Sequence, residues 1–106
     1  MAKYLLKAAY TVVGTKGLLK EGGSARRAAF EQAVRSLGGT VEAYYYCFGE
    51  ADIVTIVDLP DATSAAALSL RINAAGAVAS ATTPLVTADE IDRACKKSVK
   101  YRPPRG

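Results

Sequence analysis

Apolar side chains recur along the chain with two different spacings, and each spacing indicates one kind of secondary structure. Four segments have the alternation, or the β-branched and aromatic content, that is typical of strands. They are residues 3–11, 40–48, 52–59 and 77–86. Three other segments place apolar residues three or four positions apart, which predicts a helix with one buried face. They follow Ser24, Asp61 and Thr87.

Glycine and capping residues predict where these elements begin and end. Ser24 and Asp61 have side chains that are typical of N-caps, and Thr87-Ala88-Asp89-Glu90 matches the capping box. Gly38–Gly39 ends the first helix, because glycine adopts the left-handed conformation at little cost. Leu18–Leu19, between two glycine breaks, predicts only a short turn of helix.

The order β-α-β-β-α-β-α predicts an α+β domain with ferredoxin-like topology. Right-handed crossovers bring four strands into one antiparallel sheet and place both crossover helices on one of its faces. A chain of 106 residues has room for one such core. We therefore expect a single domain over residues 1–100. Residues 101–106 contain two prolines, cannot continue a helix and are expected to form an extended C-terminal tail.

The third strand carries apolar residues on both of its sides, in the run Ile53-Val54-Thr55-Ile56-Val57. Two crossover helices can cover only one face of the sheet, so the other face would expose Ile, Val, Tyr and Cys side chains. An exposed apolar patch of this extent usually marks an interaction surface. The simplest partner is a second copy related by two-fold symmetry. We expect a homodimer or a higher oligomer.

Composition narrows the classes of function. The chain has no histidine, which excludes a histidine-ligated haem and a Ser-His-Asp triad. Cys47 and Cys95 lack metal-binding spacing and lie in apolar patterns, so we expect buried free thiols, and neither a metal nor a cofactor. The net charge of +4 comes from a basic C-terminal end, which is interpreted as a solvated helix face.

No apolar run approaches the roughly 18 residues of a membrane helix, and the first residues lack the apolar region of a signal peptide. We therefore expect a cytoplasmic protein without membrane contact.

A group of tyrosines could form a ligand pocket. Its members are Tyr10, Tyr44, Tyr45 and Tyr46. Strict alternation places Tyr44 and Tyr46 on one face of the second strand, and Tyr45 with Val41 on the other. An apolar ring with a polar tip suits an aromatic or quinone-like ligand, although the same rings could simply fill the core and a dimer interface.

Lys7 and Asp52 are the candidates for acid–base chemistry. They lie on the first and third strands, which are neighbours in a ferredoxin-like sheet. If both reach a shared interior, one could act as a general acid or base. Otherwise Asp52 caps a turn and Lys7 extends into solvent. The candidate ligand-binding residues are thus Lys7, Tyr10, Tyr44, Tyr46 and Asp52. Other polar residues on the helices are interpreted as ordinary exposed side chains: Arg26, Arg71 and Asn73.

Several motifs over nearly the whole chain resemble the GYD-domain family. They are Lys3-Tyr4, Lys7-Ala8, Tyr10-Thr11, Gly17-Leu18-Leu19-Lys20-Glu21-Gly22-Gly23-Ser24, Leu37-Gly38-Gly39, Asp58-Leu59-Pro60-Asp61 and Lys96-Lys97-Ser98-Val99-Lys100-Tyr101-Arg102-Pro103-Pro104. The resemblance implies a relationship to the dimeric α/β-barrel superfamily, in which two ferredoxin-like sheets close around a shared interior. The family's Gly-Tyr-Asp signature corresponds here to Gly49-Glu50-Ala51-Asp52. Because Ala51 stands at the tyrosine position, no role of that tyrosine carries over.

Three classes of function remain. The first is a homo-oligomer that binds a small ligand in a pocket inside the barrel. The second is a cofactor-independent oxygenase or isomerase that acts on an aromatic compound through tyrosine and a lysine–aspartate pair. The third is nucleic-acid binding on the sheet, which we do not expect, because residues 52–58 contain no aromatic side chain for stacking and have an acid at each end.

Overall fold

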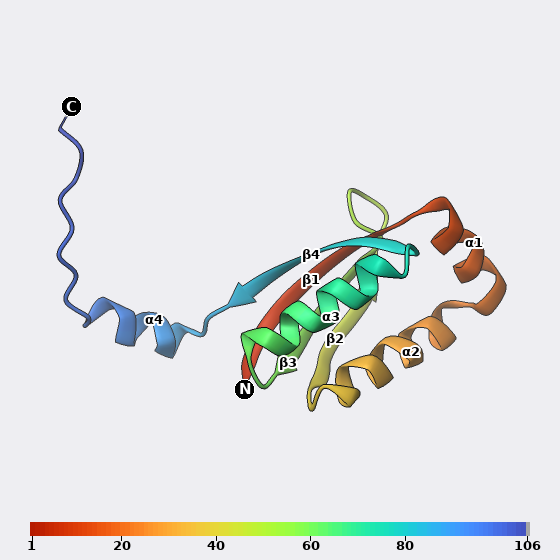
Figure 1. The fold of residues 1–106 in the computed structure, drawn as a ribbon, viewed down its shortest axis with the longest axis horizontal. Coiled ribbons are helices and arrows are strands. Elements are labelled where there is room, and N and C mark those ends of the chain that lie inside the picture. Colours follow the sequence, from red (N-terminus) through yellow and green to blue (C-terminus); the bar gives the residue numbers. More distant parts are fainter. Residues whose placement is uncertain (106) are drawn as a thin grey trace.

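The computed structural model describes residues 1–105, which form a four-stranded sheet and four helices (Figure 1). The strands are β1 (Ala2–Tyr10), β2 (Thr40–Tyr46), β3 (Ile53–Leu59) and β4 (Val78–Leu85). The helices are α1 (Val12–Glu21), α2 (Gly23–Ser36), α3 (Ala62–Ala74) and α4 (Ala88–Cys95). Each strand lies within one or two residues of its expected bounds.

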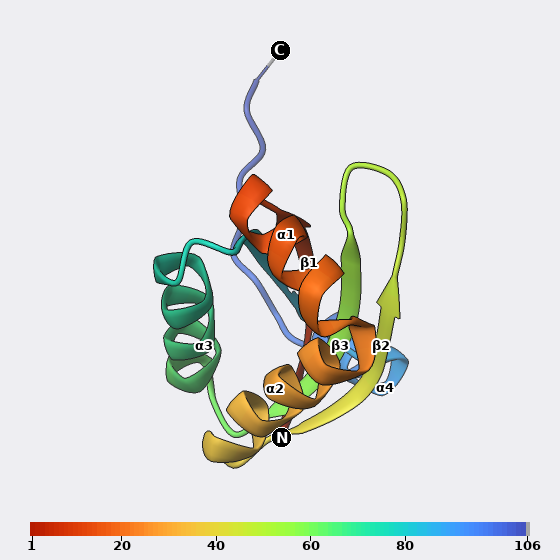
Figure 2. The ribbon, with the colours of Figure 1, turned by 90° about the vertical axis from the view of Figure 1, so that its right-hand side faces the viewer.

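The sheet has the strand order β2-β3-β1-β4, and every neighbouring pair is antiparallel. Helix α2 connects β1 to β2 and helix α3 connects β3 to β4. Both helices lie on the same face of the sheet (Figure 2). This arrangement confirms the predicted ferredoxin-like α+β fold. The two faces of the sheet are called the covered face, under α2 and α3, and the open face.

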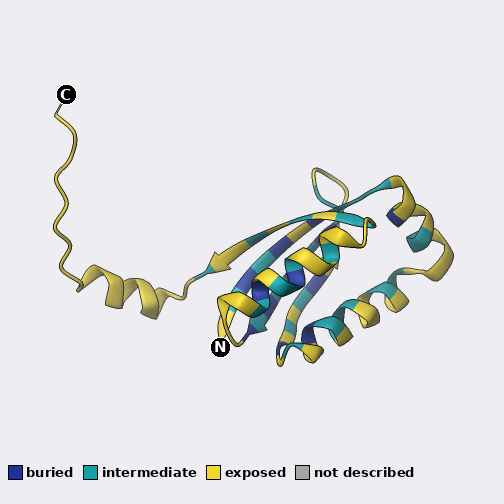
Figure 3. Ribbon diagram, viewed as in Figure 1, coloured by how far each residue is buried: buried dark blue, intermediate teal, exposed yellow. Residues whose placement is uncertain are grey.

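The hydrophobic core lies between the covered face and the two helices (Figure 3). Tyr4 and Leu6, two alternate residues of β1, are buried there. Val57 and Leu59 of β3 meet Val34 of α2, and all three have no exposed surface. Full burial of an aliphatic side chain stabilises the folded state by about 1.5–3 kcal/mol, so this layer supplies much of the folding energy.

Two glycines bring α2 close to the sheet. Gly38 has φ +80°, a left-handed conformation that ends the helix as predicted. Gly39 follows and is buried. A Cβ atom on Gly39 would overlap the carbonyl oxygen of Asp58 and lie 2.7 Å from Cδ2 of Leu59. The chain therefore needs glycine at this position for the helix to pass directly into β2.

The segment between β1 and α2 is more helical than predicted. Helix α1 has ten residues in place of a short turn, and its N-cap is Thr11, whose Oγ1 accepts a hydrogen bond from the Gly14 N–H at 3.1 Å. Gly22, with φ +86°, ends α1 and directly precedes α2. The prediction of Ser24 as the N-cap was wrong, because the left-handed glycine turns the chain two residues earlier. Asp61 does cap α3, by accepting from the Ser64 N–H.

A β-bulge between Val41 and Ala43 changes the alternation of β2. Val41 pairs with Val57 and packs against the core, and Tyr44 pairs with Thr55 on the same covered face. The predicted placement of Val41 and Tyr44 on opposite faces was therefore wrong. One extra residue in a strand reverses the side on which the following residues point.

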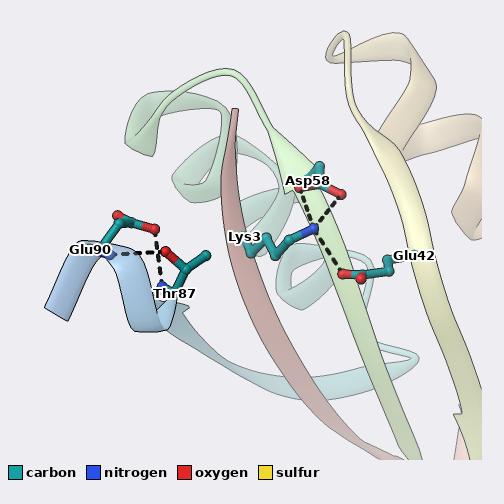
Figure 4. A network of polar contacts seen from close by, with 5 residues as sticks. All are labelled: Lys3, Glu42, Asp58, Thr87 and Glu90. Carbon is teal, nitrogen blue, oxygen red and sulfur yellow. Dashed lines mark hydrogen bonds and ion pairs between the residues drawn. The ribbon is translucent and has the colours of Figure 1, made fainter. Parts of the chain in front are cut away.

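The open face carries residues that alternate with the buried ones in register. They include Lys3, Leu5, Lys7, Ala43, Tyr45, Val54, Ile56 and Ala81. At one end of this face, Nζ of Lys3 lies 3.0 Å from Oε2 of Glu42 and 3.0 Å from Oδ1 of Asp58 (Figure 4). The hydrogen bond to Asp58, followed by that to Glu42, raises the pKa of Lys3 above its ordinary value.

After β4 the chain leaves the body of the molecule (Figures 1 and 3). Helix α4 has the predicted capping box: Thr87 Oγ1 accepts from the Glu90 N–H, and Glu90 Oε1 accepts from the Thr87 N–H, both at 3.1 Å (Figure 4). Every residue from 86 to 105 is exposed, and residues 101–105 form neither helix nor strand. Gly106, the last residue of the expected tail, lies outside the described residues.

The two cysteines are not buried as expected, although both are free thiols. Cys95 is exposed, because α4 packs against no other element in the described chain, and Cys47 is only partly buried beside the β2–β3 connection.

Candidate functional site

A cavity of about 290 Å³ lies between the covered face of the sheet and helices α2 and α3. Its floor is formed by the ends of β1, β3 and β4, and aliphatic side chains such as Leu6, Ile53 and Leu68 line most of it. The helix side contributes Phe30 and several alanines, whose small side chains leave the space between helix and sheet unfilled. The cleft is therefore mainly apolar.

Aromatic stacking positions the tyrosines beside this cleft. The ring of Tyr44 packs at 5.6 Å from that of Phe30 and makes an edge contact with Tyr46 at 5.4 Å. The Tyr44 hydroxyl donates to the Tyr46 hydroxyl at 3.4 Å, and the Tyr46 hydroxyl donates to the carbonyl oxygen of Gly23 at 2.8 Å. The chain of hydroxyls thus ends on the first residue of α2. Of the tyrosines in the described range 1–105, Tyr10 and Tyr44 line the cleft itself, and Tyr46 does not.

Burial changes the acidity of both lining tyrosines. It raises the pKa of Tyr10 to about 12, with a further contribution from the neighbouring Tyr46. Burial also raises the pKa of Tyr44 well above its ordinary value, and the hydrogen bond to Tyr46 adds to this rise. Arg26 opposes both shifts only in part. Both hydroxyls therefore stay protonated near neutral pH and can donate hydrogen bonds.

Two arginines line the cleft from opposite helices. Arg26 comes from α2 and is partly buried, whereas Arg71 comes from α3 and is exposed. Nη1 of Arg26 lies 3.3 Å from Oε2 of Glu21, an exposed ion pair that contributes little to stability. Their interpretation as ordinary surface residues missed this convergence. Arg26 on α2 and Arg71 on α3 are far apart in the sequence, so no local pattern could have paired them.

Asn73, which was grouped with these arginines, has a different position. Its Oδ1 accepts a hydrogen bond from the Ser80 N–H at 2.8 Å and so ties α3 to the start of β4. It does not line the cleft.

Asp52 and Lys7 are not brought together as an acid–base pair. Oδ2 of Asp52 accepts a hydrogen bond from the Tyr10 N–H at 2.7 Å, and the Asp52 N–H donates to the Ala8 carbonyl oxygen at 2.8 Å. These bonds attach the β2–β3 connection to the end of β1. Lys7 lies on the open face opposite Val54 and is exposed. It makes no ion pair with any residue in the described range 1–105.

A second, shallower hollow of about 400 Å³ adjoins the cleft near α1. Asp52 and Tyr46 line it together with the exposed Phe48, and Tyr10 lines both hollows. Three of the five sequence-predicted binding residues thus surround this hollow, Tyr10 and Tyr44 line the main cleft, and Lys7 belongs to neither. A pocket between two facing sheets would require a second copy and stays a prediction.

Across residues 1–105, no three His, Cys, Asp or Glu side chains lie close enough to hold a metal ion together. None of the helices described above has both the length and the apolar character needed to cross a membrane.

Comparison with known proteins places the chain in one family. The profile of the GYD domain matches residues 4–95, which include β1 from its third residue onward, the other three strands and all four described helices. The searches of curated proteins and of solved structures found no match. Since the family profile covers most of the 106 residues, this chain belongs to the GYD-domain family.

Proposed function

We propose that this protein is a homo-oligomer that binds a small, mostly apolar molecule with an acidic group in the cleft under α2 and α3. The observation that carries the proposal is the cavity of about 290 Å³, which is just below the roughly 300–1,000 Å³ of small-molecule sites and suits a small ligand. Such sites combine an apolar lining with a few polar groups that orient the ligand.

The polar groups support the choice of an acidic ligand. Arg26 and Arg71 approach the cleft from its two helical walls, and a guanidinium pairs well with a carboxylate or sulfonate. The Tyr10 hydroxyl adds a protonated donor, whereas the Tyr44 hydroxyl already donates its hydrogen to Tyr46. Among residues 1–105, no acidic side chain lines the main cleft. An aromatic or alicyclic carboxylate would match both the apolar body and the cationic edge.

The side chains favour binding over proton-transfer chemistry. A general base must reach the proton that it removes and have a pKa near the working pH. The tyrosines that line the cleft have raised pKa values, and the Asp52 carboxylate is engaged by the Tyr10 N–H. The alternative of an oxygenase or isomerase acting on an aromatic compound therefore has less support. Nucleic-acid binding has little, because the central strands expose Leu5, Val54 and Ile56 on the open face and no aromatic ring.

Fluorescent probes can test the proposal. Anilinonaphthalene sulfonate has an aromatic body and an anionic group, and N-phenyl-naphthylamine is its uncharged counterpart. Replacing Arg71→Gln should weaken binding of the sulfonate by up to about fivefold, the effect of one partly exposed charge pair, and leave the uncharged probe unaffected. Arg35→Gln, on an exposed position of α2 outside the cleft, is the control.

Blocking the cleft tests its location. Ala29 lines the cleft and Ala28, its neighbour on α2, does not, yet both are exposed. Ala29→Trp should reduce the affinity for both probes by about tenfold or more, since the indole occupies the ligand volume, and Ala28→Trp should leave it unchanged. Equal affinity of the two tryptophan variants would overturn the proposed site.

A further inference from the structure

The C-terminal arm, defined as residues 86–105, packs against no other part of the chain that the structure describes. All of its residues are exposed, and α4 buries no side chain. Ile91, Val99 and Tyr101 expose 49%, 77% and 72% of their surface. The radius of gyration is 16.9 Å, against about 13 Å for a compact domain of this length. The arm thus extends well beyond the body (Figure 1).

Helix α4 nevertheless has the features of a helix that packs on a surface. Its capping box, first-turn acids and last-turn Arg93 satisfy the helix ends. Its apolar residues Ile91, Ala94 and Cys95 lie at helical spacing, apart from the charged ones. An isolated helix of eight residues is marginal in water, and helices in proteins gain most of their stability by packing an apolar face. Helix α4 therefore needs an apolar surface beside it.

The open face is the matching apolar surface that this chain leaves uncovered. Leu5, Val54 and Ile56 form its centre and are only partly buried, and Tyr45 on β2 is 71% exposed. A stable interface needs about 800 Å² of accessible surface from each partner. An arm that packs on the partner adds its exposed apolar side chains to the area of the open face.

We propose that the arm of each chain packs on a second copy, across the rim of that copy's open face, so that two chains exchange arms. Only Val86 and Thr87 separate β4 from α4, and the helix continues past the end of its own sheet (Figure 1). Under two-fold symmetry, each arm packs on the other chain, so the same contact between arm and sheet forms twice in one dimer. This inference rests on the proposed self-association and adds the element that makes it stable.

Because the arm is basic, nucleic acid is a competing candidate for its partner. Residues 96–105 contain five Lys or Arg and no acid. Nucleic acid would bind such a segment through phosphates, without regard to Ile91. The proposal favours a second copy because apolar side chains are interspersed along the arm and the complementary apolar surface is present on the same chain.

Analytical ultracentrifugation of the full chain, combined with amide hydrogen exchange of α4, tests the proposal. The expected particle has twice the 11.1 kDa mass of one chain, and α4 amides are protected in it and lose that protection on dilution. Ile91→Asp in the arm should weaken the dimer by about tenfold or more. Leu70→Asp, the same kind of change at a more exposed aliphatic residue on α3 (71% against 49% exposed), should not.

A change on the open face supplies the reciprocal test. Val54→Lys should remove the protection of α4 although the arm itself is unaltered, and Ala81→Lys, at an exposed position, repeats the test if Val54→Lys fails to fold. Circular dichroism monitors folding of both.

Each contrary result has a distinct meaning. A dimer with unprotected α4 would overturn the arm exchange and leave self-association standing, whereas a monomer at all concentrations would overturn both. Protection of α4 in a particle with the mass of one chain would mean that the arm folds back on its own sheet. Protection that arises only on adding an oligonucleotide would identify nucleic acid as the occupant. Either result overturns the proposal.

Discussion

The two faces of the sheet are built from the same four strands and have opposite roles. On β1, Leu6 points under the helices and is 3% exposed, while Leu5 beside it points to the open face and is only partly buried. The covered face holds the core and the cleft, and the open face holds an unpaired apolar centre. Apolar residues on the two sides of one strand can therefore have different roles: one side packs in the core of its own chain, and the other side does not.

The largest expected effect comes from truncating these adjacent leucines. Leu6→Ala should lower the free energy of unfolding by about 2–5 kcal/mol, because it removes buried methyl groups and enlarges a cavity. Leu5→Ala should lower it by only about 1 kcal/mol at low protein concentration, and by more as concentration rises and the open face becomes covered. Urea denaturation at several concentrations measures both. Equal losses at the lowest concentration would remove the distinction between the two faces.

A smaller change in stability is expected from adding one methyl group at either of two glycines, one closely packed and one with open space around it. Gly39→Ala should destabilise the protein by about 1–3 kcal/mol, because the new Cβ overlaps the Asp58 carbonyl. Gly17→Ala, in α1, meets nothing within 4 Å and should stabilise by about 0.5–1 kcal/mol through higher helix propensity. Thermal unfolding compares the two. A tolerated Gly39→Ala would contradict the tight passage of α2 into β2.

The smallest expected effect is a pH dependence that arises on the covered face. Because burial raises the pKa values of Tyr10 and Tyr44, the folded protein keeps protons that the unfolded chain releases above about pH 10. The free energy of unfolding should therefore fall as the pH rises from about 10 towards the Tyr10 pKa of about 12. Guanidinium titrations at intervals across that range measure the slope. The double variant Tyr10→Phe/Tyr44→Phe should flatten it, and an unchanged slope would refute the assignment.

Much of the architecture could be predicted because the signals are local. Asp61 and Thr87 cap their helices through hydrogen bonds that span three residues, and Gly38 ends α2 through its own backbone conformation. The period of each apolar pattern then decides between helix and strand. The prediction failed at two places. The N-cap of α2 is Gly22 and not Ser24, and the bulge after Val41 reverses the alternation of β2.

The candidate site was predicted only in part. Tyr10 and Tyr44 were expected from their apolar rings and polar tips, and both line the cleft. Arg26 and Arg71 were missed because they lie on two helices, α2 and α3, that are separated in the sequence by β2 and β3. Only the folded sheet brings both helices to the same cleft. Lys7 lies on β1 as expected, but Asp52 belongs to the β2–β3 connection, one residue before β3, and its carboxylate accepts from the Tyr10 N–H instead of meeting Lys7.

The amino-acid sequence by itself determined the strands, the crossover helices and the existence of two apolar sheet faces, because spacing and capping act within a few residues. Only the tertiary structure decided that small alanines leave a cleft under α2 and α3, and that two arginines distant in sequence border it. It also decided that the arm extends away from the body with residues 86–105 exposed. These features depend on which surfaces meet and how completely they fill the space between them, and that is a property of the assembled elements rather than of any one segment.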